Sequence, residues 1–317
     1  MIGRVAAVTD PGRTRRHNED SYVIEPPLFA IADGMGGAQA GEVASGLATA
    51  ALKEGQADAG GEQRISDLIQ EANRRVYDRS SNDPNTSGMG TTITVALVEN
   101  DHVSFGHVGD SRAYLIRDAQ MEQLTEDHSL VNELLKTGKL SREEAETHPQ
   151  RSVITRALGT DPDVDVDTFS VRTESGDLFL LCSDGLTDMV SEESILDVVE
   201  RNREDIDSAL RALVKEANRG GGQDNITVVA FEIADGVLSH DGDTREQAVP
   251  AAPDDDDTLD ETDAVPVVDT AVVSVDEIAA EGTAIRRRHR RRRILAWLLI
   301  LVLIAAVAVL LYLRFLR

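Results

Sequence analysis

Very short turns between predicted strands constrain the fold more than any other feature of this sequence. Only Glu25-Pro26-Pro27 separates the apolar stretches Ser21–Ile24 and Leu28–Ala32, and Glu99-Asn100-Asp101 separates another pair. A parallel crossover needs about a dozen residues or more, so turns this short can only join antiparallel neighbours. We therefore expect an α+β domain, in which a largely antiparallel sheet is covered by helices.

Apolar stretches and helical periodicity predict the remaining elements of residues 1–235. The expected strands are Arg4–Val8, Ser21–Ile24, Leu28–Ala32, Thr91–Val98, His102–His107, Ala113–Arg117, Leu178–Cys182 and Ile226–Ile233. The expected helices are Ala40–Lys53, Ile65–Ser81, Leu130–Thr137, Glu192–Asn202 and Ile206–Asn218. Cys182 is the only cysteine, so no internal disulfide can form. Its apolar surroundings predict a buried core thiol.

The remainder of the chain divides into three segments. Residues 236–285 are rich in Asp, Ala, Thr, Val and Pro, and we expect an acidic disordered linker. An arginine-rich run, Arg286–Arg293, leads into Ile294–Leu313, twenty residues without a charge. As a helix this segment spans about 30 Å, which predicts a single transmembrane helix, and a buried core helix is disfavoured because every face is apolar. Seven arginines before it and two after it place the domain of residues 1–235 on the cytoplasmic side of the inner or plasma membrane.

The charge balance restricts the partners of the chain. It carries 57 acidic and 32 basic residues, a net charge of −25. The average field repels phosphate backbones, so we expect no nucleic-acid partner. Met1–Val8 is too short an apolar run to be expected to act as a signal peptide. The arginine run could bind anionic lipid headgroups, pair with the acidic linker, or only flank the membrane segment.

Several acidic residues are expected to converge. If the strands on either side of the Glu-Pro-Pro turn pair around it, Asp20 lies opposite Asp33, and Glu19 shares that edge of the sheet. Asp184 follows one predicted strand and Asp224 precedes another, and we expect both at the same edge. Clustered carboxylates repel one another, and a divalent cation relieves the repulsion. Oxygen ligands alone select Mg²⁺ or Mn²⁺ over Zn²⁺, and two such ions can activate a water and hold a phosphate.

Six ordered motifs carry a family resemblance. They are Thr9–Ser21, Asp33–Gly37, Gly88–Thr92, Gly109–Arg112, Ser183–Leu186 and Asp224–Asn225. Through them the chain, from about Val5 to Ile233, resembles the metal-dependent protein serine/threonine phosphatases of the protein phosphatase 2C type, particularly their bacterial members. The resemblance implies a four-layer α/β/β/α sandwich of two antiparallel sheets flanked by helices, with the metal site at one end.

The resemblance also implies ligands for two Mn²⁺ or Mg²⁺ ions and for a third, weaker one. Asp33 would bridge the two ions, and the Gly34 carbonyl would bind the second. The other implied positions are Asp184 and Asp224 on the first ion, Glu19 and Asp20 around a water of the second, and Asp110, Asp184 and Ser152 on the third.

Further positions of the resemblance concern phosphate binding and proton transfer. Arg15 matches the phosphate-binding arginine, whose planar donors suit two phosphate oxygens, with Arg13 and Arg16 as alternatives. Met35 stands where animal members carry a histidine proposed as general acid, so we expect a metal-bound water to protonate the leaving group. Residues 130–156 resemble the mobile flap beside the active site.

Together these features imply hydrolysis of phosphoserine and phosphothreonine in proteins by a water that two metal ions activate, with Arg15 and Asp33 as catalytic residues. The expected partners at the membrane are phosphoproteins, including membrane serine/threonine kinases and their substrates. Two alternatives stay open. One is a dedicated phosphatase of a single regulatory protein, of the stress or sporulation type, and the other is a catalytically inactive membrane-tethered binding module.

Overall fold

The computed structural model describes residues 1–36, 40–55, 60–141, 144–145 and 148–234. The predicted acidic linker, arginine run and membrane segment lie outside these residues. None of the helices in the described ranges combines the length and hydrophobicity needed to cross a bilayer.

One antiparallel sheet brings the first and last strands of the described chain together. Its strand order is β1-β11-β10-β7-β8. The strands are β1 (Ile2–Asp10), β7 (Arg112–Arg117), β8 (Gln120–Gln123), β10 (Leu178–Cys182) and β11 (Ile226–Ile233). Cys182 pairs with Val228 on one side and with Arg112 on the other. The end of β10 therefore lies beside the starts of β11 and β7.

The second antiparallel sheet has the order β2-β3-β5-β6-β9, and β4 pairs with β3. Its strands are β2 (Asp20–Glu25), β3 (Leu28–Met35), β4 (Gly90–Thr91), β5 (Ile93–Glu99), β6 (His102–Val108) and β9 (Asp167–Arg172). The predicted register is confirmed, because Asp20 pairs with Asp33. The expected strand 91–98 is interrupted at Thr92, whose N–H donates to the Asp33 carbonyl at 2.8 Å.

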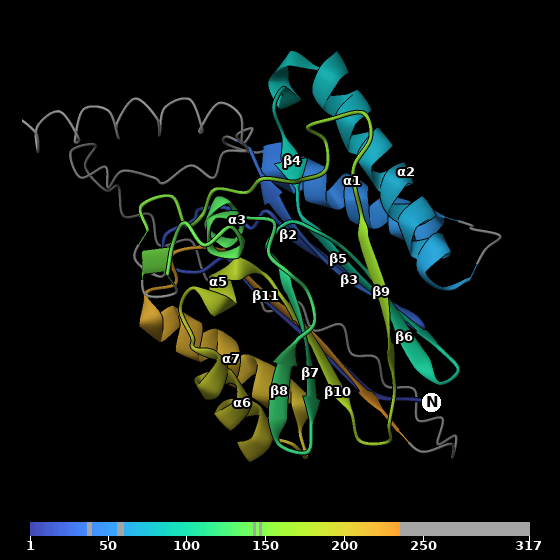
Figure 1. Ribbon diagram of the computed structural model, residues 1–317, viewed down its shortest axis with the longest axis vertical. Coiled ribbons are helices and arrows are strands. Elements are labelled where there is room, and N and C mark those ends of the chain that lie inside the picture. The colour runs from blue at the N-terminus through green and yellow to red at the C-terminus, as the bar shows by residue number, and fades with distance from the viewer. Residues whose placement is uncertain (37–39, 56–59, 142–143, 146–147, 235–317) are drawn as a thin grey trace, which may run out of the picture. The chain divides into compact units, whose positions relative to one another are not determined.

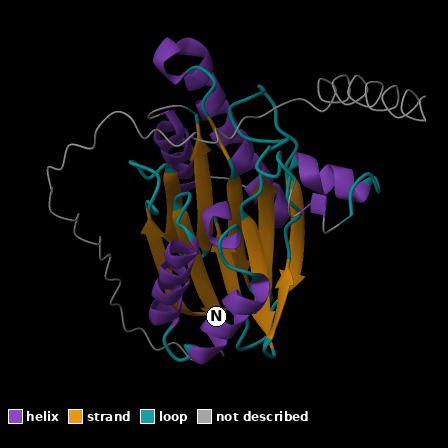
Figure 2. Ribbon diagram, turned by 90° about the vertical axis from the view of Figure 1, so that its left-hand side faces the viewer, coloured by secondary structure: helices purple, strands orange, loops and turns teal. Residues whose placement is uncertain are grey.

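Helices cover the outer face of each sheet (Figure 1). They are α1 (Ala40–Glu54), α2 (Gly61–Asn82), the 3₁₀ turn η1 (Pro84–Thr86), α3 (Leu130–Lys136), α5 (Asp184–Thr187), α6 (Glu192–Arg201) and α7 (Ile206–Gly220). Helices α1 and α2 pack on the β2-β3-β5-β6-β9 sheet, while α6 and α7 pack on the other. The strands accordingly run through the middle of the domain with helices outside them (Figure 2). The expected four-layer sandwich is confirmed for the described residues.

Apolar clusters between the sheets and beneath the helices hold these layers together. Between the sheets, the rings of Phe29 and Phe231 stack with their centroids 4.2 Å apart. Beneath α1 the buried face is built from small side chains, including Ala44 and Ala48, one helical turn apart. Small side chains let the helix lie close to β3, so the loops at the strand ends are held firmly in place.

The acidic residues meet across the two sheets, and the expectation that they share one sheet edge is wrong. Asp20 and Asp33 belong to β2 and β3, whereas Asp184 and Asp224 flank β10 and β11 of the other sheet. Hydroxyls at the ends of β10 and β11 bind Asp20, so both sheets present their acids at the same end of the sandwich. Asp110 lies between β6 and β7, where the chain crosses from one sheet to the other.

Candidate active site

Asp20 joins the two sheets through hydrogen bonds. Its Oδ2 accepts from the Thr227 hydroxyl at 2.6 Å and from the Ser183 hydroxyl at 3.0 Å. Its Oδ1 is buried and has no hydrogen-bond partner among the described residues. Burial raises the pKa of Asp20 to about 6, although both hydroxyls oppose the rise. A buried carboxylate with one unsatisfied oxygen favours a cationic ligand.

Asp33 lies near the end of β3, among the other acids of the site. Thr91 donates its hydroxyl to the Asp33 carbonyl at 2.8 Å, and the Asp33 N–H donates to the Thr92 hydroxyl at 3.0 Å. Burial raises the pKa of Asp33 well above its usual range. The neighbouring acids that add to this rise are Asp20, Asp184, Asp224 and Asp110. The predicted bridging residue therefore lies within electrostatic reach of these four acids.

Gly34 and Glu19 are packed against the start of α1. The Gly34 N–H donates to the Glu19 carbonyl at 3.2 Å. A Cβ at Gly34 would lie 2.2 Å from the Gly41 carbonyl oxygen, and a Cβ at Gly41 would lie 2.7 Å from Glu19 Oε2. Only glycine fits at either position, because any side chain would displace its neighbour. These two glycines bring the predicted ligands Glu19 and Gly34 together.

Asp184 and Asp110 lie on the opposite side of the site. Asp184 begins α5, and its buried Oδ1 has no partner within the described chain. Burial, followed by the charges of Asp110 and Asp224, raises the pKa of Asp184 well above its usual range. Burial, with Asp127 and Asp188 adding to it, raises the pKa of Asp110 to about 7. The charge of Asp110 therefore opposes the ionisation of Asp184.

Ser152 is the predicted ligand that the structure does not join to the acids. It is half-buried, and no hydrogen bond links it to Asp110 or Asp184 in the described part of the chain. The Arg151 guanidinium beside it lies 3.4 Å from Asp188, just after α5. This contact places the segment near Asp184, and a ligand role for Ser152 stays a prediction.

Arg15 is the arginine of the Arg13–Arg16 segment that contacts the acidic group. Its Nη2 lies 2.9 Å from Asp224 Oδ2. Burial lowers the pKa of Arg15, but the attraction of Asp224 and its hydrogen bond outweigh burial, so the pKa is raised. No other hydrogen bond to its guanidinium comes from the described residues, which leaves planar donors for an oxyanion. The preference for Arg15 as phosphate ligand agrees with this geometry.

Asn225 is a structural residue of the site for which the sequence indicated no role. Its Oδ1 accepts from the Glu19 N–H at 2.8 Å, and its Nδ2 donates to the carbonyls of Pro11 and His17 at 3.1 and 3.0 Å. The side chain thereby holds the loop that carries Arg15 against β11. The motif at residues 222–225 was recognisable, but partners more than two hundred residues away were not.

Comparisons with known proteins agree on one family. Residues 16–216 match the family Protein phosphatase 2C. Over 236 residues the chain is 41% identical to the serine/threonine phosphatase stp of Listeria innocua, which covers 71% of this chain and 93% of that protein. The crystal structure of the Mycobacterium tuberculosis serine/threonine phosphatase PstP/Ppp superimposes with a TM-score of 0.70 at 38% identity, over 74% of this chain and all of that one. The chain belongs to the protein phosphatase 2C family. The predicted family and its activity class, a metal-dependent serine/threonine protein phosphatase, are thus confirmed.

The acidic centre of this protein phosphatase 2C member fits a divalent cation. Within the described ranges, no group of three or more acidic, histidine or cysteine side chains is positioned to hold a metal ion. The acids have protein partners instead, with Asp224 on Arg15 and Asp20 on two hydroxyls. The donors are nevertheless all oxygen, and two buried carboxylate oxygens, on Asp20 and Asp184, have no partner in the described part of the chain. Hard cations such as Mn²⁺ and Mg²⁺ prefer such a set.

A solved relative contains the expected metal. The catalytic domain of the phosphatase PstP was crystallised in complex with two manganese ions, and it superimposes with a TM-score of 0.68 at 37% identity. That structure covers 74% of this chain and 99% of its own. The prediction of two Mn²⁺ or Mg²⁺ ions agrees with this finding, while the choice of individual ligands stays a prediction.

Proposed function

We propose that this chain hydrolyses phosphoserine and phosphothreonine in proteins in a single step at the acidic centre. One observation carries the proposal: carboxylates from both sheets converge beside Arg15, and two of their buried oxygens have no partner among the described residues. Such a centre stabilises charge on a phosphoryl group only when cations compensate the acids.

The acidic residues of the site would bind the metal ions. The residues that would do so are Glu19, Asp20, Asp33, the Gly34 carbonyl, Asp110, Asp184 and Asp224, with Ser152 as a further candidate. When bound, two divalent ions supply Lewis acidity and lower the pKa of water. Asp33 is a strong candidate ligand because the charges of Asp20, Asp184, Asp224 and Asp110 all act on its carboxylate.

Arg15 binds and orients the phosphate. A guanidinium presents two parallel N–H groups to two phosphate oxygens, and it neutralises charge that develops on them. Its contact with Asp224 keeps it pointed at the acids before the substrate arrives. Because Asn225 fixes the loop of Arg15, the phosphate is bound at a defined distance from Asp33 and Asp184.

The chain's own side chains favour direct attack by water over a covalent intermediate. Cys182 is fully buried, and burial raises the pKa of its thiol to about 12, so it is not a nucleophile. Met35, the last residue of β3, is buried and cannot donate a proton. The proton for the leaving serine or threonine oxygen therefore comes from water.

Removal of the Asp33 charge tests the proposal. Asp33→Asn in the full chain should lower Mn²⁺-dependent phosphate release from a phosphothreonine peptide by about 100-fold or more. Asp67→Asn, on the exposed face of α2, is the matched control and should retain full activity. Full activity of Asp33→Asn, or a phosphorylated protein trapped during turnover, would overturn the proposal.

We further propose that residues 294–313 anchor the phosphatase in the membrane, where it acts on membrane serine/threonine kinases and their substrates. The support is the uncharged twenty-residue segment and the seven arginines that precede it. In this arrangement residues 236–285 form the linker between the domain of residues 1–235 and the anchor. Deletion of residues 294–317 should move the protein from the membrane to the soluble fraction of a cell lysate. A truncated chain that still sediments with membranes would refute the anchor.

A further inference from the structure

The crossing segment that carries Asp110 is held on one side by His128. The Gly109 N–H donates to His128 Nδ1 at 3.0 Å, and the His128 N–H donates to the Gly109 carbonyl at 2.7 Å. Gly109 has a φ of +116°, and a Cβ there would lie 2.5 Å from the side chain of Thr92. The backbone just before Asp110 is therefore fixed by a reciprocal pair of hydrogen bonds and by tight packing.

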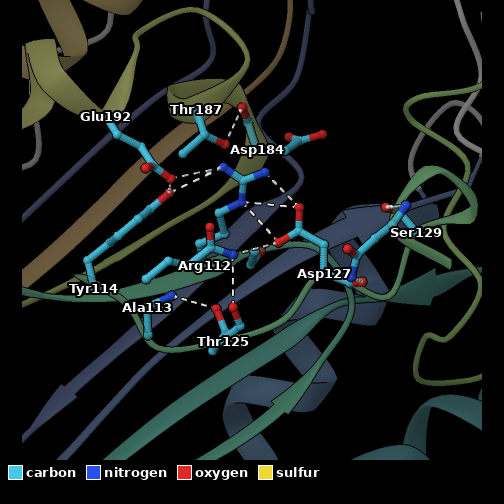
Figure 3. Close-up of polar contacts among 12 residues, drawn as sticks. Arg112, Ala113, Tyr114, Thr125, Asp127, Ser129, Asp184, Thr187 and Glu192 are labelled. Atoms are coloured by element: carbon cyan, nitrogen blue, oxygen red, sulfur yellow. Dashed lines mark hydrogen bonds and ion pairs between the residues drawn. The ribbon is translucent and has the colours of Figure 1, made fainter. Parts of the chain in front are cut away.

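The other side of the same segment is held by Asp127, the residue before His128. Asp127 accepts from Arg112 Nε at 2.9 Å and from Arg112 Nη2 at 2.7 Å (Figure 3). Arg112 Nη1 also donates to the Tyr114 hydroxyl at 3.2 Å, and this hydroxyl donates to Glu192 at 3.2 Å. Two successive residues thus hold both ends of the segment 109–112, and Asp110 lies between the two attachments.

The segment that begins with Asp127 and His128 is hydrogen bonded to residues 154–155. Ser129 bridges Ile154, and the Thr155 N–H donates to the His128 carbonyl at 2.8 Å. Because His128 Nδ1 accepts from Gly109, its Nε2 carries the proton and donates to Asp167 Oδ2 at 3.1 Å. Arg156 Nη1, also a donor, lies 3.0 Å from Nε2 and donates to Asp167 Oδ1. His128 therefore has a firm support in β9, which keeps its ring oriented toward Gly109.

We propose that Asp127 and His128 are positioning residues, which hold Asp110 in the place where it can serve as a metal ligand. The inference rests on the proposed function, because it concerns the ion assigned to Asp110 and Asp184. Neither residue needs to touch substrate or metal. Each acts through a neighbour, Asp127 through the Arg112 side chain and His128 through the Gly109 backbone.

The chain contains a matched control for this pair. Arg112 begins β7 and Arg117 ends it. Arg117 binds Asp177 in the same two-pronged manner, with Nε at 2.7 Å from Oδ1 and Nη2 at 2.6 Å from Oδ2. Asp177 is buried, so its loss should destabilise the fold at least as much as the loss of Asp127. Of the two ion pairs, only Arg112–Asp127 lies next to Asp110.

The test compares hydrogen exchange and Mn²⁺ binding in the full chain and its variants. His128→Gln removes the acceptor at Nδ1, so exchange of the Gly109 amide should become about tenfold faster. In Asp127→Asn and His128→Gln, the weakest Mn²⁺ binding step seen by calorimetry should weaken by about tenfold or more. Asp177→Asn should lower the melting temperature without either effect. His128→Asn places an amide oxygen near the Nδ1 position, so it should restore slow exchange.

Each outcome of these measurements supports or overturns the positioning role of Asp127 and His128. Mn²⁺ binding by Asp127→Asn and His128→Gln that equals the wild type, or an equal loss in Asp177→Asn, would overturn the positioning role. If His128→Gln does not fold, Asp127→Asn compared with Asp177→Asn gives the same test of Mn²⁺ binding. A wild-type chain without Mn²⁺-dependent phosphatase activity would refute the proposed function instead, while the exchange rates of Gly109 would still show whether His128 holds this segment.

Discussion

We expect the side chain of Asn225 to contribute to both the stability and the activity of this phosphatase. It is almost fully buried and makes three side-chain hydrogen bonds, to Glu19 N, Pro11 O and His17 O. Asn225→Ala removes all three, so the loop of residues 11–19 keeps its contacts through Arg13 and Arg15 to the segment before β11 but loses those to Asn225.

The expected loss follows from those three bonds. At about 1 kcal/mol each, the free energy of unfolding should fall by about 3 kcal/mol. The effect on catalysis should be larger than stability alone explains, because Arg15 lies in the released loop. A displacement of about 1 Å costs on the order of 100-fold in rate, so we expect kcat/KM for a phosphothreonine peptide to fall by about 10- to 100-fold.

Asn73 is the matched control, since it is also buried and makes three side-chain hydrogen bonds to backbone groups. Its Nδ2 donates to the carbonyls of Asp161 and Pro162, and its Oδ1 accepts from the Gly159 N–H. Asn73→Ala should lose about 3 kcal/mol as well, with far less effect on kcat/KM. Urea unfolding followed by far-ultraviolet circular dichroism measures the first quantity, and phosphate release at saturating Mn²⁺ measures the second.

The comparison can fail in two ways. If Asn225→Ala and Asn73→Ala lose the same activity, Asn225 does not position Arg15. If Asn225→Ala unfolds no more easily than the wild type, the three hydrogen bonds do not hold the loop in solution.

Three further predictions concern buried groups. Cys182, with its pKa raised to about 12 by burial, should resist iodoacetamide at pH 8 until the chain is unfolded, and full modification of the native protein would contradict this. The pKa of His107 is lowered from 6.5 to about 3, first by burial and then by His128. Between these two pKa values the unfolded chain binds one more proton than the folded chain, so the free energy of unfolding falls as the pH drops. In His107→Gln, the slope of this free energy against pH should be smaller by about 1.4 kcal/mol per pH unit between pH 4 and 6. Equal slopes in the two proteins would show that His107 is not held neutral. Gly41→Ala places a Cβ 2.7 Å from Glu19 Oε2 and should weaken Mn²⁺-dependent activity, whereas an unchanged rate would argue against Glu19 as part of the site.

Local patterns predicted the individual elements of this fold well. The turn at Pro26-Pro27 has only one compatible register, so the pairing of Asp20 with Asp33 was predictable. The expected strands Leu178–Cys182 and Ile226–Ile233 have the observed bounds. Strands β8 and β9 were missed because they are exposed or half-buried and contain few apolar residues, although Phe169 and Val171 alternate as a strand requires.

Long-range pairing could not be predicted from these patterns. Nothing local to Asp184 or Asp224 indicates which sheet their strands join, and so the acids were expected on one edge instead of across the sandwich. The same limit applies to Asn225 and His128, whose partners lie far away in the sequence. Residue types indicated the chemistry of the site, whereas its supporting hydrogen bonds became visible only in the fold.

Binding of Mn²⁺ to the full chain tests the central claim most directly. Titration calorimetry of the wild type should show at least two Mn²⁺ ions per chain, in line with the two manganese ions of the related PstP structure. Asp33→Asn should lose both strong binding steps, because Asp33 is the residue expected to bridge the two ions. An unchanged isotherm for Asp33→Asn would contradict the assignment of this acidic centre as the metal site.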